Sequence, residues 1–144
     1  MSDDRIDVLF VCVHNAGRSV AAKVLFNDSA TRLGLGLRSE SAGTIPSEQV
    51  NPSVKRVLES FNLDTSNEAP KLLTDSMLAS EPRIVTLGCN ADAEACPAIN
   101  FADVDDWDLP DPSEMADDEE IVALIHEIAR RVNALIREMS TESA

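Results

Sequence analysis

An apolar run that leads directly into a cysteine and an arginine constrains this chain more than any other feature. Residues 6–11 (Ile-Asp-Val-Leu-Phe-Val) are almost continuously apolar, which is typical of a strand buried on both faces. The segment Cys-Val-His-Asn-Ala-Gly-Arg-Ser follows at 12–19, and apolar residues then recur at helical spacing. The sequence therefore predicts a buried strand over 6–13, a loop, and a helix that begins at Ser19 and ends near Leu33.

The loop between these elements carries the residues of an oxyanion site. Five residues separate Cys12 from Arg18, so the backbone N–H groups between them can form a ring beside the positive end of a helix. Arg18 can bind two oxygens of a tetrahedral anion, and the same positive environment favours the nucleophilic thiolate of Cys12. Ser19 is placed to donate a hydrogen bond to the sulfur and to cap the helix. The alternative interpretation is a buried structural cysteine. We expect Cys12 to be the nucleophile and the binding residues to be Val13, His14, Asn15, Ala16, Gly17, Arg18 and Ser19.

The rest of the chain predicts strands that alternate with helices. We expect strands at 37–41, 83–88 and 99–104, and helices at 51–61, 75–78 and 119–139. This alternation is typical of an α/β fold with a four-stranded parallel sheet and helices on both faces. Ligands of such folds bind beyond the carboxyl ends of the strands, where Cys12 and Cys89 are both expected.

Composition limits the partners and the location of the protein. With 144 residues and 44% hydrophobic residues, the chain predicts a single domain over 1–144. No window approaches the roughly 18 apolar residues of a membrane-spanning helix, so we expect a soluble, cytoplasmic monomer. The net charge of −14 argues against nucleic acids and anionic membranes as partners. Attraction of a small anion must therefore be local, from the loop and Arg18.

An acid is also expected, because an oxygen that leaves during thiolate attack leaves more easily when it is protonated. The segment after Trp107 contains Asp111-Pro112, whose proline stiffens the chain while the tryptophan supplies an apolar wall. We take Asp111 as the candidate acid. Asp105, Asp106 and Asp108 are alternatives that the residues alone leave open.

Two further cysteines suggest redox chemistry. Six residues separate Cys89 from Cys96, a gap wider than that of metal knuckles or dithiol motifs, and no other cysteine or histidine pair completes a zinc site. We therefore expect no metal and no other cofactor. A functional interpretation is a thiol relay in which Cys89 attacks the Cys12 adduct and Cys96 then attacks Cys89. The alternative is that both thiols are incidental.

Taken together, these residues resemble the thioredoxin-coupled arsenate reductases, which share the fold of the low-molecular-weight protein tyrosine phosphatases. The two later cysteines favour the reductases, because phosphatases of this fold need only the loop cysteine, an arginine and an acid. Those phosphatases typically carry tyrosine after the Asp-Pro pair, where this chain has Ser113 and no tyrosine at all. The resemblance rests on the loop 12–19, the Ser41-Ala42-Gly43 turn, Asn51-Pro52, the run 85–87 before Cys89, Cys96-Pro97, Trp107 and Asp111-Pro112.

The resemblance implies a sequence of reactions. Cys12 would attack arsenate held by the loop and Arg18, while Asp111 protonates the departing oxygen. Cys89 would then displace arsenite by attacking Cys12, and Cys96 would form a Cys89–Cys96 disulfide that thioredoxin reduces. The alternatives are a phosphatase that hydrolyses phosphate monoesters and a non-catalytic thiol redox sensor.

The sequence departs from the family pattern behind and within the loop. Some members bind a potassium ion near the loop asparagine through carboxylate and hydroxyl groups, and the aligned positions are here Lys23, Ala69 and Lys71. We expect that this cation site is not retained, and we hypothesise that a lysine ammonium replaces the ion and positions Asn15. Gly17 stands where many members have a further cysteine.

Overall fold

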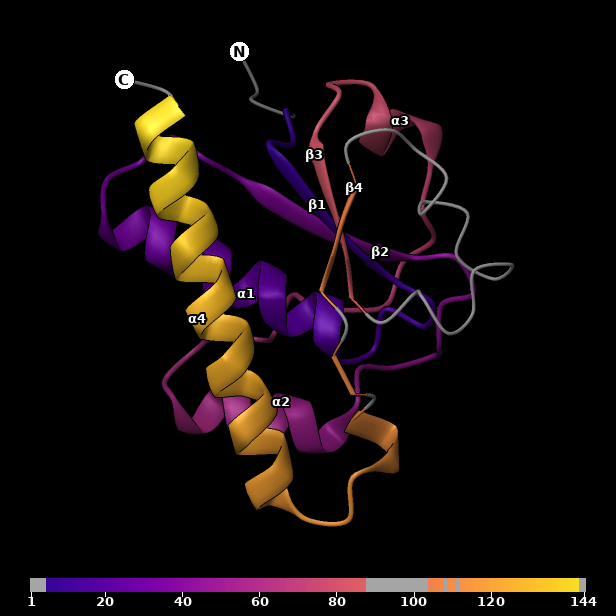
Figure 1. Ribbon diagram of the computed structural model, residues 1–144. Coiled ribbons are helices and arrows are strands. Elements are labelled where there is room, and N and C mark those ends of the chain that lie inside the picture. Colours follow the sequence, from indigo (N-terminus) through magenta and orange to yellow (C-terminus); the bar gives the residue numbers. More distant parts are fainter. Residues whose placement is uncertain (1–4, 88–103, 108, 111, 143–144) are drawn as a thin grey trace.

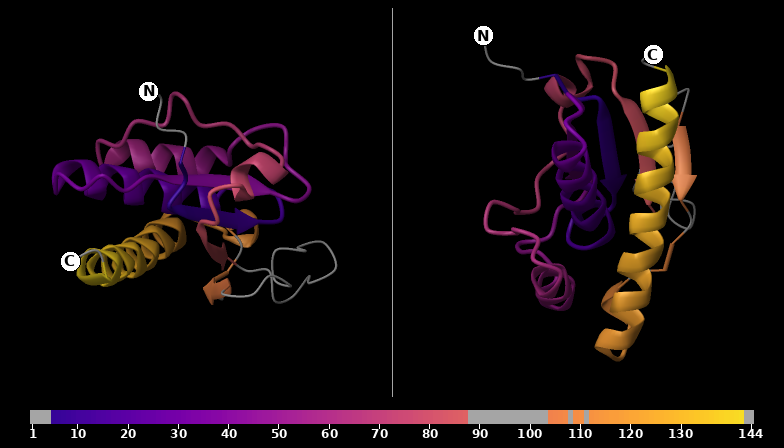
Figure 2. Two further views of the ribbon diagram at one scale, coloured as in Figure 1. Left: turned by 90° about the horizontal axis from the view of Figure 1, so that it is seen from above. Right: turned by 90° about the vertical axis from the view of Figure 1, so that its left-hand side faces the viewer.

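Four parallel strands form the centre of the molecule in the computed structural model, which describes residues 5–87, 104–107, 109–110 and 112–142 (Figure 1). The strand order is β2-β1-β3-β4, and Figure 2 shows β1 and β4 pointing in the same direction. Their bounds are Val8–Cys12 for β1, Ser39–Gly43 for β2, Arg83–Leu87 for β3 and Val104–Trp107 for β4. The predicted α/β fold with a four-stranded parallel sheet is confirmed.

The sheet is covered on both faces because the side chains of β1 alternate between two apolar clusters. Phe10 and its neighbours on one face pack against α1 (Arg18–Arg32), α2 (Pro52–Ser60) and α4 (Asp118–Glu142). Leu9 and Val11 on the other face pack beside the short α3 (Asp75–Leu78). In Figure 1, α4 runs past α1 and begins near α2. Among the described residues, no helix combines the length and the apolarity needed to cross a bilayer.

The first residues of α2 carry a side-chain cap and a proline. Asn51 Oδ1 accepts hydrogen bonds from the backbone N–H groups of Ser53 and Val54, and Pro52 occupies the first helical position of α2. One predicted cap is wrong: Ser19 lies inside α1, and Gly17 is the N-cap, with no side-chain cap bond. The apolar side of α4 is buried as predicted, through Ile121, Leu124, Ile125, Ile128, Val132, Leu135 and Ile136.

The fourth strand differs from its prediction. It was expected at 99–104, but β4 begins at Val104 and ends at Trp107; residues 99–103 lie outside the described part of the chain. Two aspartates in the middle of the strand weaken its apolar signal. They are accommodated because, within the described residues, β4 pairs only with β3, and because Arg83 and Thr86 on β3 contact them.

Trp107 is therefore the last residue of β4 and precedes the segment that contains Asp111-Pro112. Its ring is buried against Phe10, with ring centroids 5.7 Å apart, and the Arg131 guanidinium lies 6.0 Å from the indole centroid. The Trp107 side chain thus joins α4 to the sheet at the end of β4.

Candidate active site

The sulfur of Cys12 lies at the end of β1, where the strand gives way to the loop. Its residue is 3% exposed, and the backbone N–H of Asn15 donates a hydrogen bond to the sulfur over 3.2 Å. Ser19 Oγ lies 2.9 Å from the same sulfur, which is the contact that the sequence predicted. Donors directed at a sulfur stabilise negative charge on it. The local structure therefore suits a nucleophilic thiolate.

Asn15 fixes the shape of this loop. Its φ of 48° lies in the left-handed region, which asparagine tolerates better than most residues. The side chain is fully buried and bonded at both ends: Nδ2 donates to Ser19 Oγ over 2.8 Å, and Oδ1 accepts from the Lys71 backbone N–H over 2.9 Å. These bonds offset the cost of the backbone conformation and place Ser19 beside Cys12.

The loop carbonyls are tied to the segment that follows β2. The carbonyls of Val13, His14 and Ala16 accept hydrogen bonds from the backbone N–H groups of residues 45, 47 and 51, over 2.8, 2.9 and 2.7 Å. In a trans peptide the C=O and the following N–H point in opposite directions. The N–H groups of the next residues therefore point away from this segment and toward the interior of the loop, as an anion site requires.

The lack of a side chain at Gly43 permits this close approach, and the His14 ring supports it. A Cβ on Gly43 would lie 2.6 Å from the Val13 carbonyl oxygen, so only glycine fits where the end of β2 meets the loop. His14 Nδ1 lies 3.1 Å from the carbonyl oxygen of Ile45. Because a carbonyl only accepts, Nδ1 carries the proton, and the His14 side chain reinforces the same tie.

Arg18 begins α1 at the mouth of a small pocket above Cys12. Its Nη1 donates to the Leu109 carbonyl oxygen over 2.9 Å. The pocket has a volume of about 80 Å³, and its described lining residues are Cys12, His14, Ala16, Gly17, Arg18, Ser47, Asn51 and Pro112. Four of the seven predicted binding residues thus line it, whereas Val13, Asn15 and Ser19 are buried and support the loop.

Sequence reasoning missed three of these lining residues. Ser47 and Asn51 belong to the segment that ties the loop carbonyls, and Pro112 comes from the chain after β4. Asn51 and Pro112 stand in pairs that the sequence singled out, Asn51-Pro52 and Asp111-Pro112, but neither pair indicated that these residues line the pocket.

The candidate acids divide into two groups. Asp105 is exposed and pairs with Arg83, and Asp106 accepts a 2.5 Å hydrogen bond from Thr86 Oγ1. Both belong to β4 and are engaged with β3. Asp108 and Asp111 lie outside the described residues, as do Cys89 and Cys96 of the predicted relay.

A network of buried charges lies behind Asn15. Lys23 Nζ lies 2.9 Å from Glu40 Oε1 and 3.1 Å from Glu68 Oε1, and Lys71 Nζ lies 2.9 Å from the same Glu40 oxygen. The Glu40 side chain is only 13% exposed. The Glu40 and Glu68 carboxylates are thus already paired with the ammonium groups of Lys23 and Lys71. A bound potassium ion would lie close to these positive charges and be repelled by them. These residues do not fit a cation site. The bond to Asn15 comes from the Lys71 backbone N–H, not from an ammonium group.

The pKa shifts in this network follow from its pairing. Burial alone would raise the pKa of Glu40, but hydrogen bonds from Lys23, Lys71 and the Ser41 N–H bring it below its ordinary value. Burial would likewise lower the pKa of Lys23, but hydrogen bonds and charge from Glu40 and Glu68 raise it. Glu40 and Lys23 are therefore both charged at neutral pH.

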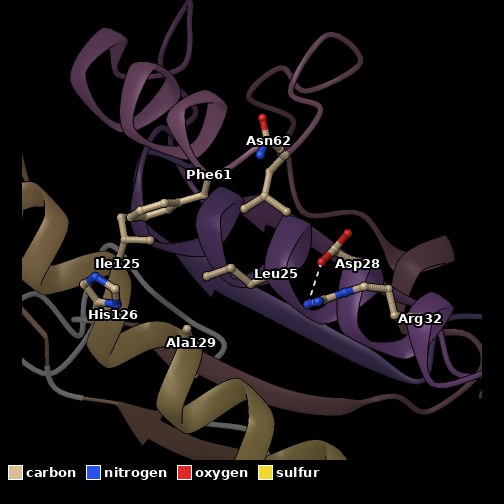
Figure 3. A pocket seen from close by; sticks show the side chains of 9 residues that line it. Leu25, Asp28, Arg32, Phe61, Asn62, Ile125, His126 and Ala129 are labelled. Atoms are coloured by element: carbon tan, nitrogen blue, oxygen red, sulfur yellow. Dashed lines mark ion pairs between the residues drawn. The ribbon is translucent and has the colours of Figure 1, made fainter.

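A larger cavity lies away from Cys12, between α1, the end of α2 and α4 (Figure 3). Its volume is about 400 Å³, and its walls include Phe61 and His126, whose ring centroids are 5.5 Å apart, together with the Asp28–Arg32 ion pair. Its described lining residues contain no cysteine or serine nucleophile. No group of three or more potential metal ligands occurs among the described residues either. The cysteine that the sequence singles out as a nucleophile lines the smaller pocket instead.

Comparison with known proteins places the chain in a family. Residues 7–144 match the family described as low molecular weight phosphotyrosine protein phosphatase, and the chain belongs to that family of enzymes. The expected resemblance is thus confirmed. A protein of Halobacterium salinarum with the curated name "Putative arsenate reductase" is 31% identical over 140 residues, which cover 92% of each chain.

Two solved structures show the same fold. The low molecular weight protein tyrosine phosphatase of T. tengcongensis is 22% identical, with a TM-score of 0.80 over 92% of this chain and 99% of its own. The thioredoxin-dependent arsenate reductase Cg_ArsC1' of Corynebacterium glutamicum is 29% identical, with a TM-score of 0.72 over 98% of this chain and 65% of its own. The fold is thus shared by structures named for both activities.

Proposed function

We propose that this protein reduces arsenate to arsenite through a relay of three thiols, as a monomeric single domain of the cytoplasm. The observation that carries the proposal is the small pocket lined by Cys12 and Arg18, in which the Asn15 N–H donates to the Cys12 sulfur. The Halobacterium relative and the Corynebacterium structure, both named as arsenate reductases, support the choice of arsenate. The latter name also supports thioredoxin as the reductant.

The proposed steps balance in atoms and electrons. The Cys12 thiolate attacks arsenic, and one oxygen leaves as water after it receives a proton from Asp111. Cys89 then attacks the Cys12 sulfur, forming a Cys12–Cys89 disulfide while the two electrons of the broken S–As bond reduce arsenic to arsenite. Cys96 attacks Cys89, which frees Cys12 as a thiol and leaves a Cys89–Cys96 disulfide. A thioredoxin dithiol reduces that disulfide and is itself oxidised.

The sheet register supports a short path between the first two thiols. Val11 on β1 pairs with Thr86 on β3, so Leu87, the last residue of β3, follows beside Cys12 at the same edge of the sheet. Neighbouring strands lie about 4.8 Å apart, and two residues of chain span at most about 7 Å. Leu87 is thus the last described residue before Cys89, which follows two positions later in the sequence.

The contacts of the chain after β4 support Asp111 as the acid. Leu109 accepts a hydrogen bond from Arg18, and Pro112 lines the pocket above Cys12. Asp111 lies between these two anchors in the sequence. The competing residues Asp105 and Asp106 are engaged with β3 instead.

A thiol count tests the proposal directly. Fully reduced protein is treated with one equivalent of arsenate without any reductant, and the remaining thiols are counted and mapped by peptide mass spectrometry. We expect the loss of two thiols and a bridge between Cys89 and Cys96. Cys12→Ser is the control, because it removes the first nucleophile, and it should lose no thiols to arsenate.

The phosphatase alternative has its own support in the family match, because the family description names a phosphotyrosine protein phosphatase. It predicts hydrolysis of a phosphate monoester while all three thiols stay free after arsenate treatment. A redox sensor predicts a stable oxidised state without turnover. Persistent arsenate-dependent thiol oxidation in Cys12→Ser would contradict the relay, because that variant lacks the first nucleophile.

A further inference from the structure

Gly17 and Pro112 touch across the pocket above Cys12. A Cβ added to Gly17 would lie 2.7 Å from Pro112 Cγ and 3.5 Å from Val54 Cγ2. The first distance is too short for two carbons, and the proline ring is held by the backbone, so it cannot turn aside as a flexible side chain would. Glycine is therefore needed here for the contact with the proline ring.

The same stretch of chain is anchored to the loop a second time. Arg18 Nη1 donates to the Leu109 carbonyl three residues before Pro112, and both Leu109 and Pro112 are buried. Two contacts, from adjacent loop residues, thus hold Leu109 and Pro112 against the loop. The pocket that remains has a volume of about 80 Å³. Pockets for drug-sized ligands are typically about 300–1,000 Å³.

We propose that the contact between Pro112 and Gly17 is a size filter, which admits inorganic tetrahedral oxyanions and excludes anions that carry an organic group on the central atom. An oxyanion of four oxygens needs only the loop amides, Arg18 and the volume beneath Pro112. A phosphate ester needs further room where its organic group leaves the pocket, beside the proline ring. The inference rests on the proposed oxyanion chemistry at Cys12 and names the residues that set its substrate class.

The filter is tested by comparing two anions of the same geometry. The reduced protein is treated with iodoacetamide, and alkylation of the Cys12 peptide is followed by mass spectrometry in the presence of inorganic phosphate or phenylphosphonate, which has a phenyl ring in place of one oxygen. We expect phosphate to protect Cys12 at concentrations at least about tenfold lower than phenylphosphonate, a difference of about 1.4 kcal/mol.

Two variants open the filter from opposite sides. Gly17→Ala forces Pro112 away from the loop, and Pro112→Ala removes the ring while leaving Gly17 in place. In each variant we expect the preference for phosphate over phenylphosphonate to fall about tenfold. The second variant serves where the first does not fold. Gly36→Ala is the matched control, since its Cβ would meet no atom within 4 Å, and it should keep the wild-type preference.

The outcomes separate this inference from the proposed function. Equal protection by both anions in the wild type, or an unchanged preference in both variants, overturns the filter while arsenate reduction stands. Selective protection by phosphate in a protein that arsenate fails to oxidise supports the filter and rejects the relay. If neither anion protects Cys12, both are wrong.

Discussion

The two sides of the loop after β1 are held in different ways. Behind the loop, a continuous chain of polar contacts runs from the Cys12 sulfur through Ser19, Asn15 and Lys71 to Glu40, and every step is buried or half-buried. In front of the loop, Arg18 donates one hydrogen bond to the Leu109 carbonyl, and Gly17 lies against the Pro112 ring. The rear therefore sets the geometry of the nucleophile, whereas the front sets what reaches it. Substitutions behind the loop should lower stability and activity together, and those in front should lower activity alone.

The largest effect is expected at the front, for Arg18→Lys. Lysine keeps the charge but loses the planar fork that binds two oxygens, so the rate of arsenate-dependent thiol oxidation should fall about 10²–10³-fold. Thermal unfolding measured alongside should be nearly unchanged, because the arginine makes one described hydrogen bond. A large loss of stability would contradict the division between front and rear.

Asp111→Asn should slow the first chemical step about 10²-fold, because the departing oxygen then receives no proton from the side chain. Single-turnover oxidation by arsenate measures this step, and protection of Cys12 by phosphate should be largely intact. The matched control is Asp106→Asn on β4, which should leave the single-turnover rate unchanged. An unchanged rate in Asp111→Asn would move the acid to a neighbouring aspartate.

Behind the loop, Asn15→Ala should cost about 2–3 kcal/mol of unfolding free energy, since it leaves the Lys71 N–H without its acceptor and places alanine at a left-handed φ. Denaturant unfolding measures the loss, and activity should fall with it. Asn62→Ala is the matched control: its φ is 64° but its side chain is exposed, so only about 1 kcal/mol is expected. Equal costs at the two sites would show that the buried hydrogen bonds contribute nothing.

The smallest effect concerns the pH dependence of stability. Because the pKa of Glu40 is lowered in the folded protein, its contribution is present above the unfolded value of about 4.3 and is lost as the pH falls through the folded value. Glu40→Gln should therefore be less stable than the wild type at pH 7, and the difference should shrink in acid. Asp118→Asn, which breaks an exposed pair with Arg56, should give a smaller difference that salt removes.

The contacts behind the loop change the hypothesis that a lysine ammonium replaces a bound cation and positions Asn15. The sequence placed Lys23 and Lys71 near the loop asparagine by resemblance, but the contact with Asn15 is made by a backbone N–H that any residue at 71 could supply. The ammonium groups act one step further back, by pairing with Glu40. A rate that responds to potassium beyond its ionic strength would contradict the poor fit of these residues to a cation.

Local pattern alone determined the order of the elements, the parallel sheet, the loop of Cys12 and Arg18, and the buried side of α4, because hydrophobic period and capping residues act over a few positions. It failed at β4, where two aspartates hide the strand, and at Ser19, where the helix begins one residue earlier than its cap was expected. Only the tertiary structure decided that Asn15 reaches Lys71, that Gly43 admits the loop and that Pro112 rests on Gly17. These contacts join segments from 28 to 95 residues apart, and no local propensity encodes which distant atoms will fill a given space.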